Sequence, residues 1–391
     1  MRLMNRRDFC LGTTLATTAF GSAVAAPRGL DLAAIDRARI LKAADRYLGE
    51  APVTLTAFAA PRSPAGRHDY YSEADYWWPD PANPKGPYVR RDGYSNPAKF
   101  TAHRHAMIRL GVQLPALAAA YRVTGQARYA DHAERHLRAW FVSPDTRMNP
   151  NLEHAQAIIG VNTGRGIGVI DTLHLVEVAQ AIVVLRALRP RAAVYGPATA
   201  WFDAYLTWMT TSANGVDERD QKNNHGSCWA LQAAAFARLT GGETALEVAR
   251  ARVRALVPGQ IAADGAQPLE LVRTKPYGYC LFNLDVLAAC AHVLSTPADD
   301  LWTWKGATGG SIADALAWMA PFIADKTTWP RPPDVEAWAG WPVRQPSLLF
   351  GGLALGRKDY LDLWRRLDPD PTEPEILRNY PLRQPVLWID D

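Results

Sequence analysis

Apolar residues recur at spacings of three and four along most of the 391-residue chain, which is the pattern of helices with one buried face. The expected helices cover residues 40–47, 105–121, 127–140, 170–188, 198–209, 228–239, 245–256, 281–294 and 312–322. Glycine and proline interrupt this pattern, for example at Thr240-Gly241-Gly242. Few alternating runs suggest strands and no fixed-length repeat is present, so the pattern predicts an all-α array in a single domain. The tail, 326–391, is expected to add helices with irregular connections.

Two long stretches lack helical spacing, at residues 69–96 and 149–168. Loops of this length inside a compact domain are usually functional or disordered, and the aromatic content of the first argues against disorder. Its aromatic residues are Tyr70, Tyr71, Tyr76, Trp77, Trp78, Tyr88 and Tyr94. Sugar rings stack on such side chains, so the first loop is expected to line a saccharide cleft. The alternative is that these rings cover helix ends.

The N-terminal residues have the three parts of a bacterial export signal. Paired arginines, Arg6 and Arg7, precede a modestly apolar run that ends at Phe20, and a small-residue cleavage site follows at residues 23–25. Paired arginines before such a run are typical of the twin-arginine route. We therefore expect a signal over residues 1–26 and a periplasmic or secreted mature protein. The alternative, a buried N-terminal helix, would have to pack three charged side chains.

Removal of this signal changes the formal charge from +4 to +2, because three arginines and one aspartate leave with it. A nearly neutral protein is not expected to bind nucleic acid through its global charge, so any polyanion must be attracted by a local cleft. After the signal, no segment has the roughly 18 uncharged apolar residues of a membrane span.

Three cysteines remain in the mature chain, Cys228, Cys280 and Cys290. Cys280 and Cys290 are expected on one helix, where ten residues rise about 15 Å, too far for a disulfide. A bridge between Cys228 and Cys280 is left open, and the alternative is three buried thiols. The spacing is not that of a zinc site.

Asn223-Asn224-His225 begins one of the expected helices, directly after the polar run 217–222. A helix N-terminus disfavours a histidine cation, so a neutral His225 is expected to accept a proton or hold a substrate group. Asn224 can donate a hydrogen bond to a carboxylate oxygen. Alternatively, one asparagine is the helix N-cap, and a lone histidine at a helix start is more often structural.

Arg273 and Tyr279 flank the start of a second expected helix about fifty residues later. A tyrosine with its ordinary pKa of about 10 is a poor base near neutrality unless a cation stabilises the phenolate, as Arg273 could. Tyr277 fits this role as well as Tyr279 does, and either could be a core tyrosine with a satisfied hydroxyl. Together the two segments offer an amide, an imidazole, a guanidinium and a phenol. This set suits removal of a proton next to a carboxylate and protonation of a leaving oxygen.

These segments give the chain a resemblance to the alginate lyase superfamily, helical-barrel polysaccharide lyases that act on mannuronan and, in a related branch, on glucuronan. The matching pieces are Tyr70-Tyr71-Ser72-Glu73-Ala74-Asp75-Tyr76-Trp77-Trp78-Pro79-Asp80-Pro81, Arg90-Arg91-Asp92-Gly93-Tyr94-Ser95-Asn96-Pro97, residues 160–171, Asn223-Asn224-His225 and residues 273–283. The resemblance implies an incomplete (α/α) toroid or barrel as one catalytic domain over residues 27–391. It also implies that Asn224, His225, Arg273 and Tyr279 are catalytic, which selects Tyr279 over Tyr277.

The reaction expected from this resemblance is β-elimination in a 4-linked uronic-acid polymer, an anionic polysaccharide. Asn224 neutralises the carboxylate next to C5 with help from Arg273, and His225 is a further candidate donor, so no metal or other cofactor is required. Tyr279, its pKa lowered by Arg273, takes the C5 proton and then protonates O4, because both lie on one face of mannuronate. His225 is expected to orient the substrate, and to act as base on guluronate, where the two groups lie on opposite faces. The product has a 4,5-unsaturated end.

Further residues are expected to bind the polymer. Trp77 and Trp78 are expected to stack on sugar rings. Neighbouring carboxylates are expected to meet Arg91, His103, Arg104, Asn162 and Arg165, each of which has a purely structural alternative. Two departures from the alginate lyase pattern leave the uronic acid open between mannuronate, glucuronate and a less familiar uronic acid. Gly-Ser-Cys-Trp follows the Asn-Asn-His motif in place of Ser-Tyr-Trp, and the arginine-to-tyrosine spacing is six rather than seven.

Two other functions are alternatives. Helical toroids also host inverting glycoside hydrolases, which need two carboxylates about 6.5–9.5 Å apart. The candidate carboxylates are Glu73, Asp75, Glu153, Asp171 and Glu270, and their spacing shows no pairing. The other alternative is a uronan-binding protein without catalytic activity.

Overall fold

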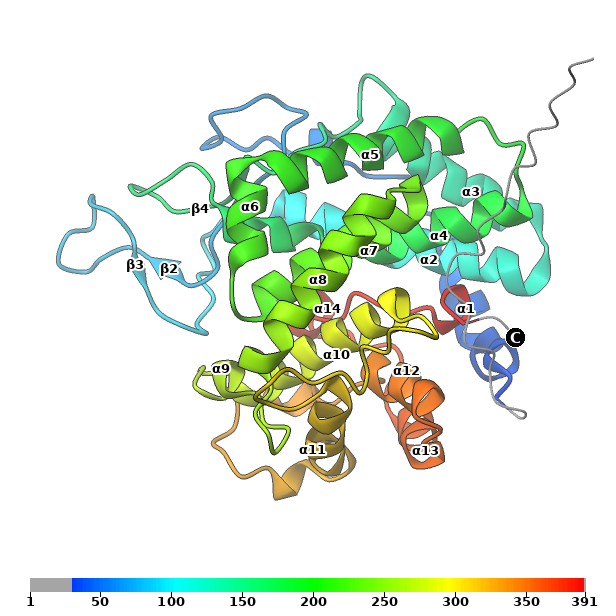
Figure 1. Ribbon diagram of the computed structural model, residues 1–391. Helices are drawn as coiled ribbons and strands as arrows, with labels where there is room; N and C mark the ends of the chain where they lie inside the picture. The colour runs from blue at the N-terminus through cyan, green and yellow to red at the C-terminus, as the bar shows by residue number, and fades with distance from the viewer. Residues whose placement is uncertain (1–29, 390–391) are drawn as a thin grey trace, which may run out of the picture.

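The computed structural model describes residues 30–389, so the expected export signal at residues 1–26 lies outside the described residues. Helices dominate this part of the chain, and each segment expected from the apolar spacing has a helical counterpart (Figure 1), which confirms the all-α prediction. The helices are α1 (Leu32–Leu48), α2 (Ala102–Thr124), α3 (Ala127–Leu137), α4 (Leu175–Leu188), α5 (Tyr195–Thr211), α6 (Ala213–Asp220), α7 (Asn224–Thr240), α8 (Glu243–Gln260), α9 (Pro268–Leu271), α10 (Pro276–Leu294), α11 (Ile312–Ala324), α12 (Pro346–Ala354), α13 (Lys358–Arg366) and α14 (Pro374–Arg378).

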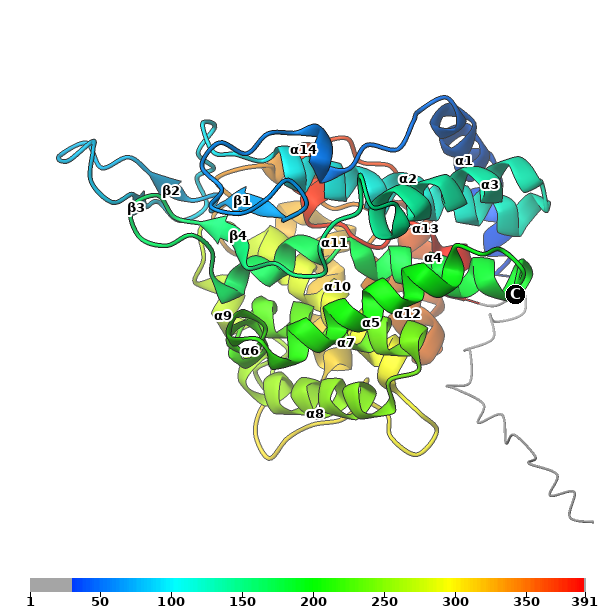
Figure 2. The same ribbon diagram turned by 90° about the horizontal axis from the view of Figure 1, so that it is seen from above.

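The helices form an incomplete (α/α) toroid with an inner and an outer layer (Figures 1 and 2). The inner helices α2, α4, α7, α10 and α12 pack side by side in that order, and most of their residues are buried. The outer helices α1, α3, α5, α8, α11 and α13 each pack one face against an inner neighbour. This two-layer arrangement is the architecture that the resemblance implied.

The two helices at the candidate motifs start where they do for local reasons. The side chain of Asn223 accepts a hydrogen bond from the backbone N–H of His225 and so caps α7. Pro276 occupies the first turn of α10, where an N–H would have no helical partner. At the other end of α7, Gly241 takes a left-handed conformation (φ +81°) that a side chain would disfavour. Asn223 is therefore the cap, and Asn224 does not have that role.

Two small sheets, which the apolar pattern did not indicate, organise the long loops. β1 (Tyr71–Glu73) pairs in parallel with β4 (His154–Ala157), so the two loops lie against each other. β2 (Trp77–Trp78) and β3 (Val89–Arg90) form an antiparallel hairpin. A 3-10 turn at Gly166–Thr172 leads the second loop toward α4. Figure 2 shows all four strands at one end of the toroid, where α6 and α9 also lie.

The segment after α13 returns to the middle of the toroid (Figure 1). The carboxylate of Glu177 on α4 accepts backbone N–H bonds from Arg383 and Gln384 and an indole N–H bond from Trp388. Burial raises the pKa of Glu177 to about 7, although these donors act in the opposite direction. The bonds tie the C-terminal segment to an inner helix, a few residues after α14.

The cysteines and the most apolar helix belong to the core. Cys228, Cys280 and Cys290 are buried free thiols, so the bridge left open between Cys228 and Cys280 is not formed. Cys280 and Cys290 share α10, as predicted. By length and composition α10 could cross a membrane, but 89% of its apolar stretch is buried inside the toroid, as in the core helix of a globular domain.

Candidate active site

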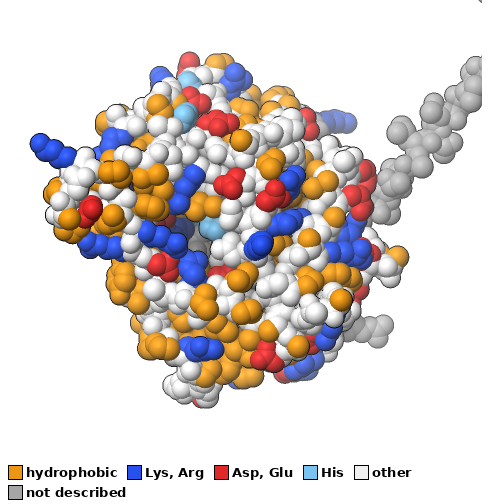
Figure 3. All heavy atoms as spheres, turned by 60° about the vertical axis from the view of Figure 1, so that its left-hand side comes forward, with side chains coloured by type: hydrophobic (Ala, Val, Ile, Leu, Met, Phe, Trp, Pro, Cys, Tyr) orange, Lys and Arg blue, Asp and Glu red, His pale blue; other side chains and the backbone are white. Residues whose placement is uncertain are grey.

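The starts of α7 and α10 meet at a cavity of about 300 Å³, which Asn224, His225, Arg273 and Tyr279 all line. The charged lining comprises Arg90, Arg104, Arg165, Arg273 and Arg378 against only Asp75 and Asp171. Figure 3 shows a hollow on this side of the molecule, bordered by Lys and Arg side chains and with a histidine inside it. This excess of cations over carboxylates suits an anionic ligand.

Asn224 is held in the cavity wall by a buried glutamate. Its backbone N–H donates to Oε1 of Glu270 at 3.1 Å, and its side-chain Nδ2 donates to Oε2 at 2.8 Å. Burial raises the pKa of Glu270, while the two bonds from Asn224 lower it. An amide nitrogen has two hydrogens, so one N–H of Asn224 is not used by Glu270. That N–H can meet a ligand oxygen.

His225 is oriented by a second buried glutamate. Its Nδ1 lies 3.0 Å from Oε1 and 3.1 Å from Oε2 of Glu218, whose side chain is fully buried. Burial raises the pKa of Glu218, and His225 acts against that rise. A proton on Nδ1 is donated to the carboxylate, which leaves Nε2 as the ring nitrogen available to a bound molecule.

The phenol of Tyr279 stands at the centre of a polar cluster. Its OH lies 2.8 Å from the OH of Tyr76 and accepts a hydrogen bond from Nη2 of Arg273 at 3.2 Å. The guanidinium of Arg273 also lies over the Tyr279 ring, 4.3 Å from its centre. Tyr277 has a different location, because its OH donates to the backbone oxygen of Phe322 at 3.0 Å in the core. Tyr279, and not Tyr277, therefore reaches the cavity.

The pKa of Tyr279 differs from the expectation. Burial raises it well above its ordinary value and Tyr76 acts in the same direction, whereas Arg273 lowers it, as expected, but by less. The expectation of a lowered pKa for Tyr279 is therefore wrong, because the residue is only 9% exposed and loses the hydration that would stabilise a phenolate. Tyr279 is a neutral phenol near neutral pH and accepts a hydrogen bond from Arg273.

Arg273 is fixed by an aspartate from the first long loop. Its Nη2 donates to Oδ1 of Asp92 at 2.9 Å and its Nε donates to Oδ2 at 3.2 Å. Burial opposes the ionisation of Asp92, but Arg273 and Arg90 together lower its pKa to about 2. This bidentate pair leaves the guanidinium of Arg273 few ways to turn away from Tyr279.

Three of the expected binding residues also line the cavity, namely Trp77, Arg104 and Arg165. Arg165 lies over the Trp77 ring at 5.9 Å and donates from Nη2 to the side chain of Gln156 at 3.1 Å. Burial lowers the pKa of Arg165 to about 10, so it remains a cation at neutral pH. Arg104 bonds to two aspartates and belongs to the cavity wall.

Four expected binding residues lie outside the cavity lining. His103 is buried, with Nδ1 accepting from the backbone N–H of Tyr71 and Nε2 3.1 Å from the oxygen of Phe58, so neither nitrogen is open to a sugar. The side chain of Asn162 accepts from the N–H of Ile158 within its own turn. Arg91 and Trp78 lie on the β2–β3 hairpin and stack on each other, 5.0 Å from guanidinium to ring. The direct substrate contacts expected of these residues are not supported by their positions.

The carboxylates considered for a hydrolase do not form an acid–base pair. Of the five, only Asp75 and Asp171 line the cavity, and Arg104 bonds to both, at 2.7 and 3.2 Å. Burial opposes ionisation, yet Arg104 and Arg378 hold the pKa of Asp75 well below its ordinary value. Asp75 therefore cannot supply a proton near neutral pH. Among residues 30–389, no cluster of three or more His, Cys, Asp or Glu side chains is placed to hold a metal ion.

Several residues of the site were given no role, or a different role, by sequence reasoning. Glu218 lies in the polar run before the Asn-Asn-His motif, and Tyr76 lies in the aromatic loop, so each had a weak signal. Asp92 and Glu270 act through tertiary contacts with residues far away in the chain. Arg378 enters the cavity from α14, a segment that carried no motif.

Comparisons with known proteins found one family model and several solved structures that are similar to this chain. A family model described as alginate lyase matches residues 54–329. The crystal structure of an alginate lyase from Bacteroides ovatus is similar over 89% of this chain and 93% of its own, with a TM-score of 0.75 and 29% identity. Alginate lyase A1-III from a Sphingomonas species shares the fold over 83% of this chain and 88% of its own (TM-score 0.50, 16% identity).

A variant of alginate lyase A1-III complexed with a tetrasaccharide is similar over 84% of this chain and 89% of its own, with a TM-score of 0.55 and 15% identity. At these identities the two A1-III structures show a common fold alone. No curated protein matches the chain.

Proposed function

Because the chain belongs to the alginate lyase family and is a polysaccharide lyase, we propose that it cleaves 4-linked uronic-acid polymers, poly-mannuronate or glucuronan, by β-elimination. The observation that carries this proposal is the meeting of Asn224, His225, Arg273 and Tyr279 in one arginine-rich cavity. The twin-arginine motif in the sequence supports the further proposal that the enzyme is periplasmic or secreted.

The first requirement of the reaction is to neutralise the carboxylate next to C5, since removal of the C5 proton adds charge beside it. The unused N–H of Asn224 supplies one donor, and Nε2 of His225 supplies another when it carries a proton. Arg165, which also lines the cavity, adds a cation. Donors that are already fixed by Glu270 and Glu218 need no reorganisation as the enolate charge develops.

Proton transfer is assigned to Tyr279. Its phenolate takes the C5 proton, the electron pair of the C5–H bond forms the C4–C5 double bond, and the C4–O4 bond breaks. The same phenol then gives the proton to O4, so the phenolate is regenerated and no proton is gained or lost. Arg273 and the hydroxyl of Tyr76 are both placed to donate to the phenolate when it forms.

The stereochemistry of the substrate decides whether one residue suffices. Mannuronate and glucuronate have the same configuration at C4 and C5, with the C5 proton and O4 on one face of the ring. A single tyrosine can then serve as base and acid. Guluronate places the two on opposite faces, and its cleavage would need His225 as the base. The proposal therefore ranks poly-mannuronate and glucuronan above polyguluronate.

A substrate panel tests the proposal. The purified enzyme is incubated with poly-mannuronate, polyguluronate, glucuronan and hyaluronan, and the ultraviolet absorbance of the 4,5-unsaturated end is followed together with new reducing ends. A lyase raises both signals in step on at least one polymer. Reducing ends without the ultraviolet signal would mean a hydrolase, and binding with neither signal would mean a non-catalytic protein; either result would reject the proposal.

A further inference from the structure

A second, larger groove lies beside the catalytic cavity. It measures about 960 Å³ and runs between α1, α2 and α14, with Glu50, Lys99, Arg109, Val112, Glu336 and Glu375 among its lining residues. The groove and the cavity share four lining residues, Asp75, Arg104, Ile108 and Arg378. These four residues are the partition between the two spaces.

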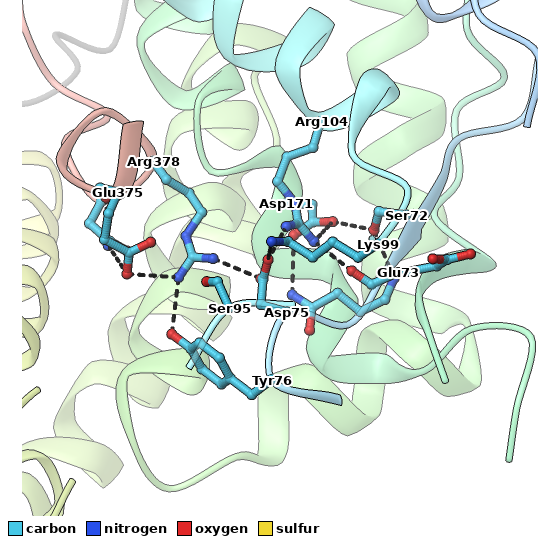
Figure 4. A network of polar contacts seen from close by, with 12 residues as sticks. Ser72, Glu73, Asp75, Tyr76, Ser95, Lys99, Arg104, Asp171, Glu375 and Arg378 are labelled. Atoms are coloured by element: carbon cyan, nitrogen blue, oxygen red, sulfur yellow. Dashed lines mark hydrogen bonds and ion pairs between the residues drawn. The ribbon is translucent and has the colours of Figure 1, made fainter. Parts of the chain in front are cut away.

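The polar part of this partition is a buried charge network, drawn in Figure 4. Nη1 of Arg378 lies 2.7 Å from Oδ2 of Asp75, and Nη1 of Arg104 lies 2.7 Å from Oδ1 of the same carboxylate. Lys99 approaches that carboxylate to 3.5 Å. Arg378 is also held at 3.2 Å by both Glu375 and the hydroxyl of Tyr76. Asp75 thus joins α2 to α14 across the end of the cavity.

The two sides of the partition come from different parts of the chain. Asp75 and Arg104 lie within residues 54–329, which the family model matches, whereas Arg378 and the whole of α14 lie beyond it. One side of the partition is therefore contributed by the C-terminal segment. Without the Arg378 side chain, the boundary would consist of Ile108, the short side chain of Asp75 and its bond to Arg104.

We propose that the Arg378–Asp75 ion pair ends the substrate-binding cavity and limits how far a polysaccharide chain can extend past the catalytic residues. The enzyme then takes a chain end into the cavity and releases short products of narrow length range. The second groove is the space that a longer chain would enter if the partition were opened. This inference rests on the proposed lyase function, and it assigns Arg378 as the residue that determines product length.

Arg378 can be replaced without leaving a buried charge unpaired. Asp75 keeps its bond to Arg104 and its contact with Lys99. Glu375 keeps its bond to Lys275 at 2.5 Å. Replacement of Asp75 would instead remove the partner shared by the buried Arg104 and the partly buried Arg378, which is more destabilising. Arg378→Ala is therefore the informative variant, with Arg378→Lys as the conservative one.

The first experiment measures the lengths of unsaturated products early in the digestion of the preferred polymer. The unaltered enzyme is expected to give a narrow set of short products while long chains persist, and Arg378→Ala is expected to give longer products and a faster loss of chain length per bond cleaved. Arg378→Lys should restore short products. In the double variant Arg378→Ala/Val112→Trp, the indole should fill the groove next to the opened partition and also restore short products. A broad product range from the unaltered enzyme, or an unchanged range in Arg378→Ala, overturns the inference.

The second experiment separates this inference from the proposed function, because it needs no catalysis. Tyr279→Phe protein, with and without Arg378→Ala, is titrated calorimetrically with saturated uronate oligosaccharides of graded length. With Arg378 present, affinity should stop rising at a short length; with Arg378→Ala, longer oligosaccharides should bind about tenfold more tightly. Equal length dependence in both proteins overturns the partition even if lyase activity is found. The expected difference would support the partition even if no unsaturated product appears.

Discussion

Nδ1 of His225 lies 3.0 Å from Oε1 of Glu218, a carboxylate with no exposure to solvent. Glu218 is on α6 and His225 is in the first turn of α7, so the bond also fixes the turn between the two helices. The bond between His225 and Glu218 decides which ring nitrogen faces the substrate. A proton held on Nδ1 by Glu218 leaves Nε2 as the nitrogen exposed to the cavity.

Replacement of Glu218 should therefore reduce catalysis through His225. In Glu218→Gln the amide can turn its NH₂ toward Nδ1, which favours the other tautomer and lets the ring rotate. We expect kcat/KM on the preferred polymer to fall by up to about 100-fold, since small displacements of a positioned group have effects of that size. The thermal midpoint is measured in parallel, and Asp217→Asn on the exposed side of α6 is the matched control. Full activity in Glu218→Gln would show that the imidazole needs no fixed orientation.

Replacement of Tyr279 tests the assignment of base and acid. Tyr279→Phe removes the only atom proposed to carry the proton, so the initial rate of ultraviolet absorbance should fall by about 100- to 10,000-fold. Tyr277→Phe is the control, because its hydroxyl bonds to a backbone oxygen in the core. That variant should lose a little stability and keep its lyase rate. If Tyr279→Phe turned over like the unaltered enzyme, another residue would have to be the base.

The pH dependence follows from the raised pKa of Tyr279. Only the phenolate can take the C5 proton, and the pKa of this group lies well above its ordinary value because of burial. Its ionised fraction increases with pH throughout the range below that pKa. We therefore expect kcat/KM to rise from neutral into alkaline pH and to reach no plateau near pH 7. A rate that falls as the pH rises above 7 would contradict a phenolate base.

Arg273 should determine the pH at which kcat/KM rises. In Arg273→Met the phenolate loses a charge-assisted hydrogen bond worth about 2 kcal/mol, so the rate at neutral pH should fall about 30-fold and the rise should move to higher pH. Asp92 stays paired with Arg90 at 2.6 Å, so its carboxylate keeps a cationic partner in this variant. The measurement is the pH–rate profile of both proteins. A reduced rate with an unmoved profile would mean that Arg273 acts on the substrate and not on Tyr279.

The helices could be predicted from the sequence, whereas the four catalytic candidates were selected by the resemblance to the alginate lyase superfamily. Apolar periodicity reports which face of a helix is buried, and the motifs lie at helix starts that carry local signals such as Asn223 and Pro276. The partners of these residues could not be predicted, because pairs such as Arg273 with Asp92 form only when the toroid closes. His103 shows a different error. It was expected to bind substrate, but both of its ring nitrogens form hydrogen bonds with backbone groups.

Glu177 gives a prediction for stability. Its pKa is raised from about 4.5 when unfolded to about 7 when folded, because it is buried. Between these values the folded protein binds more protons than the unfolded chain. The free energy of unfolding should therefore decrease as the pH rises from 4.5 to about 7. Above pH 7 the titration of Glu177 should cause no further change. Glu177→Gln should remove this part of the slope in chemical denaturation. An identical slope in both proteins would mean that Glu177 does not titrate in this range.

The ties between Glu177 and the last residues of the chain have a consequence for how activity is lost. Arg378 and Asn379 reach the cavity only while the segment that carries them is docked, through the Arg378–Asp75 ion pair, the bonds to Glu177 and the apolar side chains that the segment buries. A short segment held in this way can detach at lower free energy than the whole toroid needs to unfold. On heating, lyase activity is therefore expected to be lost at a lower temperature than helix content. Activity then reports on the docking of the C-terminal segment, and helix content reports on the folding of the toroid.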